Sequence, residues 1–256
     1  MPGLRREEVA MLAGMSVDYY TRIERGNLRG VSDEVLHCLA EALRLDEAER
    51  GHLFDLARAA NAGGAARART RRGSGQLRPV VQRMLDAMDT MPAFVRNGRL
   101  DIVGSNLLGR ALYSPVYDFA ARAGADTVNT ARFQFLAPEA AASYWGDQAP
   151  RIRHDAVAIL RAEAGRNPYD KELSDLVGEL STRSMEFRQL WANHDVRYHR
   201  SGTKVFHHPV VGRLELDYEA LLLPADEGLQ LNVYTAPVGR RRTTGSGCSP
   251  HGPTGR

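Results

Sequence analysis

The chain has 256 residues, which is enough for one large domain or two ordinary ones. Its apolar share of 43%, charged share of 25% and net charge of +3 are ordinary for a globular protein, and they permit nucleic-acid binding without requiring it. No apolar run approaches the roughly 18–20 residues that span a bilayer, and the first residues lack the apolar core of a secretion signal. We therefore expect a cytoplasmic protein that makes no membrane contact.

The two cysteines, Cys38 and Cys248, are too few for a disulfide framework. Cys38 falls inside an apolar helical pattern, whereas Cys248 falls in a polar tail. We interpret Cys38 as a small core residue and expect no disulfide in a reducing compartment.

Residues 1–60 are predicted to form a head made of helices, because apolar residues recur there at intervals of three and four. Ser32 and Asp46 each stand directly before acidic residues, a pattern typical of a helix N-cap followed by a favourable first turn. Helix starts are therefore expected at both positions.

Within the head, the segment from Leu4 to Gly26 predicts two helices joined by a tight turn. Gly14 can adopt the positive φ that such a turn needs, Met15 fills the corner, and Ser16 is placed to cap the second helix. The side chains expected to pack inward are Val9, Leu12, Tyr20 and Ile23. The second helix leaves one face exposed, formed by Val17, Asp18, Thr21, Arg22 and Arg25.

This spacing, with the turn glycine, the cap serine and the closing Glu24-Arg25-Gly26, resembles the XRE-type helix-turn-helix family. The resemblance implies that the second helix lies in the major groove of double-stranded DNA. It implies base contacts from Val17, Asp18 and Arg22, with Arg22 on a guanine edge. The same surface includes Thr21, and the phosphate contacts that the resemblance implies come from Arg6, Ser16, Arg25, Asn27 and Arg29.

Members of that family have a further helix ahead of the motif, and here the chain begins almost at the motif. We expect that either the true start lies upstream or the head is incomplete and less stable. Because one recognition helix buries little surface, we also expect a homodimer on a palindromic site.

Residues 61–78 are predicted to be a flexible linker, because Gly, Ala and Arg replace the large apolar residues there. The linker arginines at 67, 69, 71 and 72 either stay solvated or touch DNA phosphate. Residues 238–256 are rich in Gly, Arg, Ser, Thr and Pro, which predicts a disordered tail.

Residues 79–237 are predicted to form a second, α+β domain with an antiparallel sheet and helices on one face. The Asn97-Gly98 pair between two short apolar runs indicates a hairpin, and Asn106 opens a helix after it. Leu214, Leu216 and Tyr218 alternate with acidic residues, as in a half-buried strand. Helices are expected at 80–89, 151–165 and 170–194, and strands at 204–208, 213–223 and 229–235.

Short motifs follow one another through this second domain in a fixed order. They are Ala131 to Pro138, Leu160 to Arg166, Leu176 to Ser181, Phe187-Arg188 with Trp191 and His194, and His208 to Gly212 ahead of Asp217-Tyr218-Glu219. In order and spacing they resemble the ligand-binding domain of MmyB-like transcription regulators. The resemblance implies a PAS-like fold around an apolar pocket for a small hydrophobic ligand, with a fatty acid as the leading candidate.

A ligand that carries a carboxylate needs one or two buried donors among apolar walls. The donor candidates are Asn106, Arg110, Arg132, His194 and Arg197. The wall candidates are Phe94, Phe133, Phe135, Leu190, Trp191, Leu221 and Tyr234. For each of these residues the alternative is plain core packing or a solvated surface charge.

Two other classes of function are alternatives to a DNA-binding regulator, an enzyme and an antitoxin-like module. An enzyme is disfavoured, because His194, His199, His207 and His208 lack the spacing and partners of a metal site, and the chain has no phosphate loop, nucleophile elbow or CxxC. We therefore expect no catalytic residue, metal or cofactor. An antitoxin-like module, in which the rear domain holds a protein partner, remains the alternative.

Overall fold

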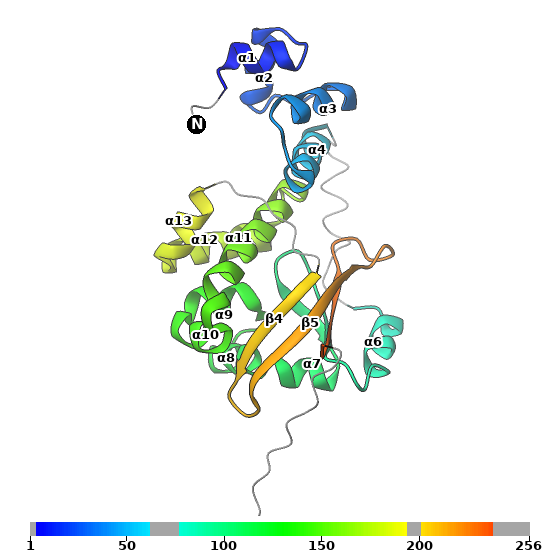
Figure 1. The fold of residues 1–256 in the computed structure, drawn as a ribbon, viewed down its shortest axis with the longest axis vertical. Helices are drawn as coiled ribbons and strands as arrows, with labels where there is room; N and C mark the ends of the chain where they lie inside the picture. Colours follow the sequence, from blue (N-terminus) through cyan, green and yellow to red (C-terminus); the bar gives the residue numbers. More distant parts are fainter. Residues whose placement is uncertain (1–3, 62–76, 194–200, 238–256) are drawn as a thin grey trace, which may run out of the picture.

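A computed structural model describes residues 4–61, 77–193 and 201–237, which form a helical head and a rear domain built on one sheet (Figure 1). The predicted tail and most of the predicted linker lie outside the described residues. The same is true of His194 and Arg197, which belong to neither. Within those residues, no helix is long and apolar enough to cross a membrane.

The head is formed by α1 (Arg6–Leu12), α2 (Val17–Glu24), α3 (Asp33–Ala42) and α4 (Glu47–Asn61). Gly14 has a φ of +67° between the first two helices, and Ser16 Oγ accepts a hydrogen bond from the Tyr19 amide at 3.2 Å. Asp46 and Glu49 cap α4 reciprocally, since each carboxylate accepts from the other residue's amide at 2.9 Å. Local turn and capping chemistry thus sets these helix ends where the sequence predicts them.

Two side chains of the head point outward where the sequence analysis expected them to be buried. Leu12 is 58% exposed, and Cys38 is an exposed free cysteine. The buried face of α1 is formed by Val9, Ala10 and Ala13, and that of α3 by Leu36, Leu39 and Ala40. Small alanines occupy the inward positions because the helices of this compact head approach closely, so the larger Leu12 lies outside.

The rear domain is built on a six-stranded antiparallel sheet with the strand order β3-β2-β1-β6-β5-β4. The strands are β1 (Ala93–Arg96), β2 (Asp101–Ser105), β3 (Val128–Asn129), β4 (Ser201–His208), β5 (Gly212–Leu222) and β6 (Gln230–Thr235). The last strand therefore returns to the centre of the sheet and pairs Asn232 with Phe94. This pairing places residues from both ends of the domain side by side on one face.

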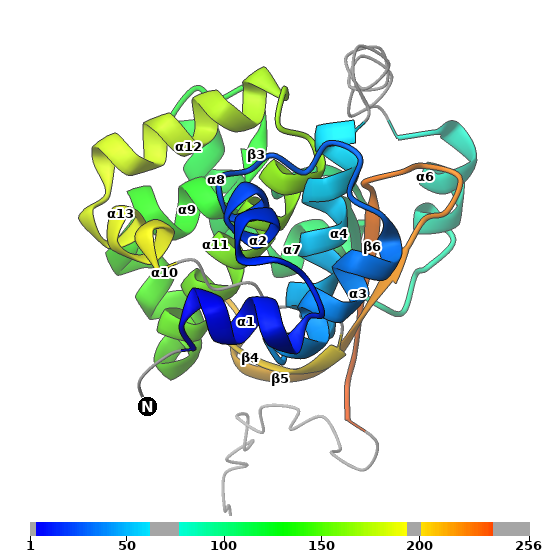
Figure 2. The same ribbon diagram turned by 90° about the horizontal axis from the view of Figure 1, so that it is seen from above.

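Most helices of the rear domain cover one face of the sheet, the face that carries Phe94, which we call the inner face (Figures 1 and 2). One helix covers the other face. The inner layer holds α7 (Leu107–Leu112), α8 (Ser114–Arg122), α9 (Thr130–Leu136), α10 (Pro138–Trp145), the 3-10 turn η1 (Gly146–Gln148) and α11 (Ala149–Arg166). On the opposite face, α6 (Pro79–Asp86) packs Val81 and Leu85 against Val95 and Leu231. The predicted α+β class is confirmed, but the prediction that helices cover one face alone is wrong, because the apolar side chains of Val95 and Leu231 need a helix on the other face as well.

The helix predicted over 170–194 is divided in two, α12 (Lys171–Arg183) and α13 (Met185–Ala192). Ser184 between them has extended backbone, with φ −128° and ψ 115°, and its hydroxyl accepts from the Phe187 amide at 3.2 Å. The serine acts as an N-cap in the middle of an apolar pattern, which periodicity alone does not reveal.

The hairpin between β1 and β2 is longer than the two-residue turn that Asn97-Gly98 predicts. The Asn97 side chain accepts from the amides of Arg99 and Asp101 at 2.9 and 3.0 Å, and Leu100 has a φ of +69°. A Cβ on Gly98 would collide with the Glu163 carboxylate of α11. The glycine is thus needed for close approach of the turn to α11.

The core between the sheet and its inner helices is rich in aromatic rings. Tyr113 and Tyr234 share a hydrogen bond between their hydroxyls at 2.6 Å, and the ring of Phe206 lies 6.0 and 5.6 Å from theirs. The other buried rings of this cluster are Phe94, Phe133, Tyr144, Trp145 and Tyr218. Four of these rings, Phe94, Tyr113, Trp145 and Tyr218, also line the pocket described below.

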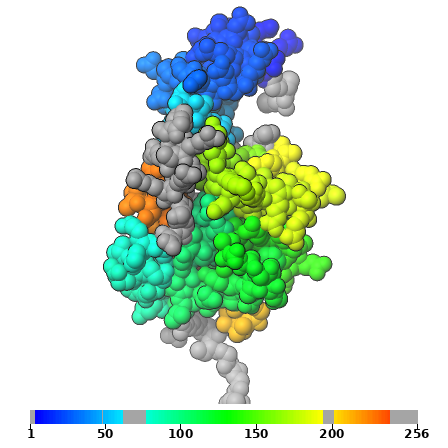
Figure 3. All heavy atoms as spheres, turned by 180° about the vertical axis from the view of Figure 1, so that it is seen from behind, coloured from blue at the N-terminus to red at the C-terminus, as the bar shows by residue number. Residues whose placement is uncertain are grey.

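The head joins the rear domain where α4 lies against the C-terminal part of α11 (Figures 1 and 3). Gly165 of α11 lacks a side chain at the point of closest approach, and a Cβ there would lie 2.8 Å from His52 Nδ1 and 3.4 Å from Leu56 Cδ2. Next to it, the Arg166 guanidinium pairs with the Asp55 carboxylate of α4 at 3.5 Å. The contact between α4 and α11 therefore combines a close approach of the two helices at Gly165 with an ion pair.

Candidate DNA-binding surface and ligand pocket

The exposed face of α2 carries the residues for which the sequence predicts DNA contacts. Val17 is 40% exposed, and Asp18, Arg22 and Arg25 are exposed too, while Tyr20 and Ile23 are buried behind them. The Arg22 guanidinium stacks over the Tyr19 ring at 4.8 Å, which holds the charge at the surface of the helix. Asn27 and Arg29, just after the helix, are exposed as well.

Three of the predicted DNA contacts have structural partners within the head. Ser16 caps α2, and the Thr21 hydroxyl donates to the Val17 carbonyl at 2.8 Å. Arg6 of α1 pairs with Glu24 of α2 at 2.5 Å, and this hydrogen bond lowers the pKa of the Glu24 carboxyl. Arg6 thus links the two helices of the motif and is partly neutralised before any phosphate approaches.

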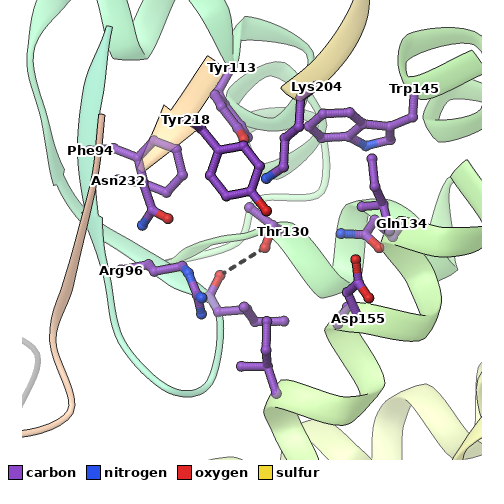
Figure 4. Close-up of a pocket in the computed structure, with 14 residues that line it drawn as sticks. Phe94, Arg96, Tyr113, Thr130, Gln134, Trp145, Asp155, Lys204, Tyr218 and Asn232 are labelled. Carbon is purple, nitrogen blue, oxygen red and sulfur yellow. Dashed lines mark hydrogen bonds between the residues drawn. The ribbon is translucent and has the colours of Figure 1, made fainter. Parts of the chain in front are cut away.

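A pocket of about 80 Å³ lies between the inner face of the sheet and the helices α9 and α11 (Figure 4). Strand alternation turns Phe94 and Arg96 of β1 to this face, and helical spacing does the same for Thr130 and Gln134 of α9. The remaining lining residues are Leu100, Tyr113, Trp145, Ile152, Asp155, Ala156, Ile159, Lys204, Tyr218 and Asn232. The pocket thus draws on both halves of the sheet.

Two cations, Arg96 and Lys204, point into this largely aromatic space (Figure 4). Lys204 Nζ lies 4.2 Å from the centre of the Tyr218 ring. Within the described part of the chain, no carboxylate lies within 4.0 Å of either cation. Two cations without an ion-pair partner in that part of the chain are costly to hold in a mostly apolar pocket, whose lining also includes the Asp155 carboxylate.

Burial and mutual repulsion shift the ionisation of both cations. Desolvation, followed by the charge of Arg96, lowers the pKa of Lys204 to about 7, and Asp155 opposes this shift. Desolvation also lowers the pKa of Arg96 to about 10, against the effect of the neighbouring tyrosines. Burial raises the pKa of Tyr113 and Tyr234, so these phenols remain neutral donors near pH 7.

Three buried polar atoms of the lining residues have no hydrogen-bond partner within the described residues. They are Gln134 Oε1, Trp145 Nε1 and the Tyr218 hydroxyl, and these side chains belong to residues at most 5% exposed. An unsatisfied buried polar group costs about 1–3 kcal/mol. A concentration of such groups around one cavity marks the cavity as a candidate binding site.

The donors predicted from sequence lie elsewhere. Asn106 caps α7 and donates to the carbonyls of Met88 and Met91 at 2.6 and 2.7 Å, which uses its amide fully. Arg110 stacks on Tyr117 at 4.6 Å, and Arg132 pairs with Glu179 at 2.8 Å. None of these three lines this pocket, and among the predicted wall residues only Phe94 does. Arg132 instead lines a second cavity, of about 530 Å³, together with residues of α8 and α12.

The sequence analysis did not predict that Arg96, Lys204, Gln134 and Tyr218 line the pocket. A usable signal was present for two of them. Arg96 follows Phe94 with the spacing of one strand face, and Lys204 precedes Phe206 in the same way. A charged residue on the apolar face of a predicted strand marks a site that needs a partner.

These features define a DNA-binding transcription regulator with a ligand-binding domain. Residues 77–245 match the family model of the MmyB-like transcription regulator ligand binding domain, and residues 2–53 match that of a helix-turn-helix domain. The first match covers more than half of the chain, so the chain belongs to the family of MmyB-like transcription regulators. None of the curated proteins matches it.

Proposed function

We propose that this regulator holds a small apolar acid in the pocket of its rear domain and that occupancy of the pocket changes its affinity for operator DNA. A fatty acid is the first candidate, because the walls are aromatic and aliphatic while Arg96 and Lys204 supply unpaired positive charge. The observation that carries the proposal is that one helix, α11, both lines the pocket and contacts α4 of the head.

The coupling follows from the geometry of this helix. Ile152, Asp155, Ala156 and Ile159 share the face of α11 that lines the pocket. Gly165, the point of contact with α4, follows Ile159 by six residues, or about 9 Å along the helix axis at about 1.5 Å per residue. A ligand that displaces the first half of a stiff helix also displaces the second, and the head moves with it.

The proposal includes three further parts. The rear domain is PAS-like, supported by its antiparallel sheet with a pocket under the inner helices. The regulator acts as a homodimer, since α2 is only 8 residues long and one such helix reads few base pairs. The pocket senses its ligand without chemical turnover, because its cations are arranged to bind an anion.

Denaturing extraction of purified protein, followed by mass spectrometry, tests the ligand. The expected result is a stoichiometric apolar acid, and adding that compound back should change the dissociation constant for operator DNA. A protein that binds operator DNA with a single stable protein partner, and never with a small acid, would contradict the proposal and favour the antitoxin-like alternative.

Arg22→Ala is expected to weaken operator binding by about 1–3 kcal/mol and to relax specificity at one base pair. The exposed guanidinium is the longest donor on the outward face of α2. Binding should be measured against the operator and its single-base variants at fixed salt. Arg122→Ala, an exposed arginine on α8, is the matched control. Equal weakening on every sequence would show that Arg22 contacts only phosphate.

A further inference from the structure

The polar end of the pocket offers more than an anion site. Arg96 and Lys204 account for one negative charge, but the Gln134 amide lies on α9, on the side of the cavity away from Arg96 (Figure 4). Gln134 is 5% exposed, and its carbonyl oxygen has no hydrogen-bond donor among the described residues. An unsubstituted fatty acid carries no donor near its carboxylate and would leave this oxygen unsatisfied.

The size of the cavity adds a second constraint. At about 80 Å³ it has room for a carboxylate and a short chain, since one water needs roughly 10–15 Å³ of such cavity space. Any group that meets Gln134 while the carboxylate meets Arg96 and Lys204 must therefore sit close to the carboxylate along the chain. A hydroxyl fits, because it both donates and accepts, and an amide side chain offers the complementary pair.

We propose that the ligand is a hydroxylated carboxylic acid, with its carboxylate between Arg96 and Lys204 and its hydroxyl, on carbon 2 or 3, bonded to the Gln134 amide. The Tyr218 hydroxyl and the Trp145 indole N–H, which also lack partners among the described residues, line the same cavity. This assignment rests on the proposed function, because it specifies the head group of the acid that the pocket senses.

Titration calorimetry with matched pairs of acids tests the assignment on the full-length protein. The probes are butyrate against 2-hydroxybutyrate and 3-hydroxybutyrate, and pentanoate against 3-hydroxypentanoate. We expect at least one hydroxylated acid to bind roughly 10- to 100-fold more tightly than its parent, because a site with a buried amide rejects an analogue that leaves the amide unpaired. Comparison within each pair cancels the effect of chain length.

Gln134→Leu should remove this preference, whereas Lys204→Met should weaken every acid. Gln82→Leu on α6, on the other face of the sheet, is the control, and the melting temperature of each unliganded variant reports folding.

Parent acids that bind as tightly as hydroxylated ones, or a preference that survives in Gln134→Leu, would overturn the assignment. A parent acid that binds and shifts operator affinity, without any preference for the hydroxylated form, would overturn the assignment while supporting the proposed function. If no acid binds at all, the ligand part of the proposed function fails too.

Discussion

Replacing Gly165 with leucine is expected to remove the effect of the pocket ligand on operator binding while both affinities, measured separately, stay close to wild type. A Cβ at this position already lies 2.8 Å from His52 Nδ1, and the His52 ring can turn to accept it. The longer leucine side chain also meets Leu56 and cannot be accommodated without moving α4 away from α11. The head then no longer follows the helix that lines the pocket.

The measurement is the operator dissociation constant with and without saturating ligand. Gly178→Leu is the matched control, because a Cβ on that helical glycine of α12 meets nothing within 4 Å. Gly165→Ala should give an intermediate result, since only the His52 ring must adjust. A Gly165→Leu protein that keeps the full ligand response would show that the signal reaches the head by another route.

Lys204→Met is expected to stabilise the ligand-free protein by roughly 1–3 kcal/mol at pH 6.5, because it removes an unpaired cation from a mostly apolar pocket while keeping most of the side-chain volume. The same change should cost the protein its affinity for acids. A residue that destabilises the empty protein and is required by the ligand is typical of binding sites.

The pH dependence gives the sign of this effect. The pKa of Lys204 lies at about 7 in the folded protein against an ordinary value of 10.5. Below pH 7 the amine is charged in both states, and the folded protein bears the full desolvation cost. Between about pH 7 and 10.5 only the unfolded chain holds the proton, so the wild type gains stability as the pH rises.

Chemical denaturation of wild type and variant at pH 6.5 and pH 9.5 tests this. The advantage of Lys204→Met should shrink at the higher pH, where the Lys204 amine of the folded wild type is mostly neutral. Lys171→Met, an exposed lysine paired with Asp175 on α12, should show no such trend. An advantage that is the same at both pH values would mean that Lys204 is not desolvated.

The head could be predicted from sequence because local chemistry determines most of it. Gly14 and Ser16 fix the turn and the start of α2 within a few residues, whatever surrounds them. The prediction was wrong for Leu12 and Cys38, because which side of a short helix is buried depends on partners that the periodicity does not show. The DNA contacts themselves stay a prediction.

The rear domain could be predicted as separate strands and helices but not as an assembled pocket. The pairing of β6 with β1 joins residues about 140 positions apart, and no local pattern indicates it. The Arg132 side chain is a suitable hydrogen-bond donor for a carboxylate ligand. In the fold, however, it pairs with Glu179, which lies 47 residues further along the chain. Arg96 on β1 and Lys204 on β4 line one pocket only because the strand order of the sheet brings them to the same face. That strand order could not be predicted from the sequence.

The contact between Gly165 and α4 has a thermodynamic consequence. If an acid in the pocket changes the operator dissociation constant by some factor, operator DNA must change the acid's dissociation constant by the same factor. The operator is therefore an effector of the pocket as much as the acid is an effector of the head. A regulator bound at its site on the chromosome then responds to a different concentration of acid from one that is free, and the contact on α11 sets the ratio of the two.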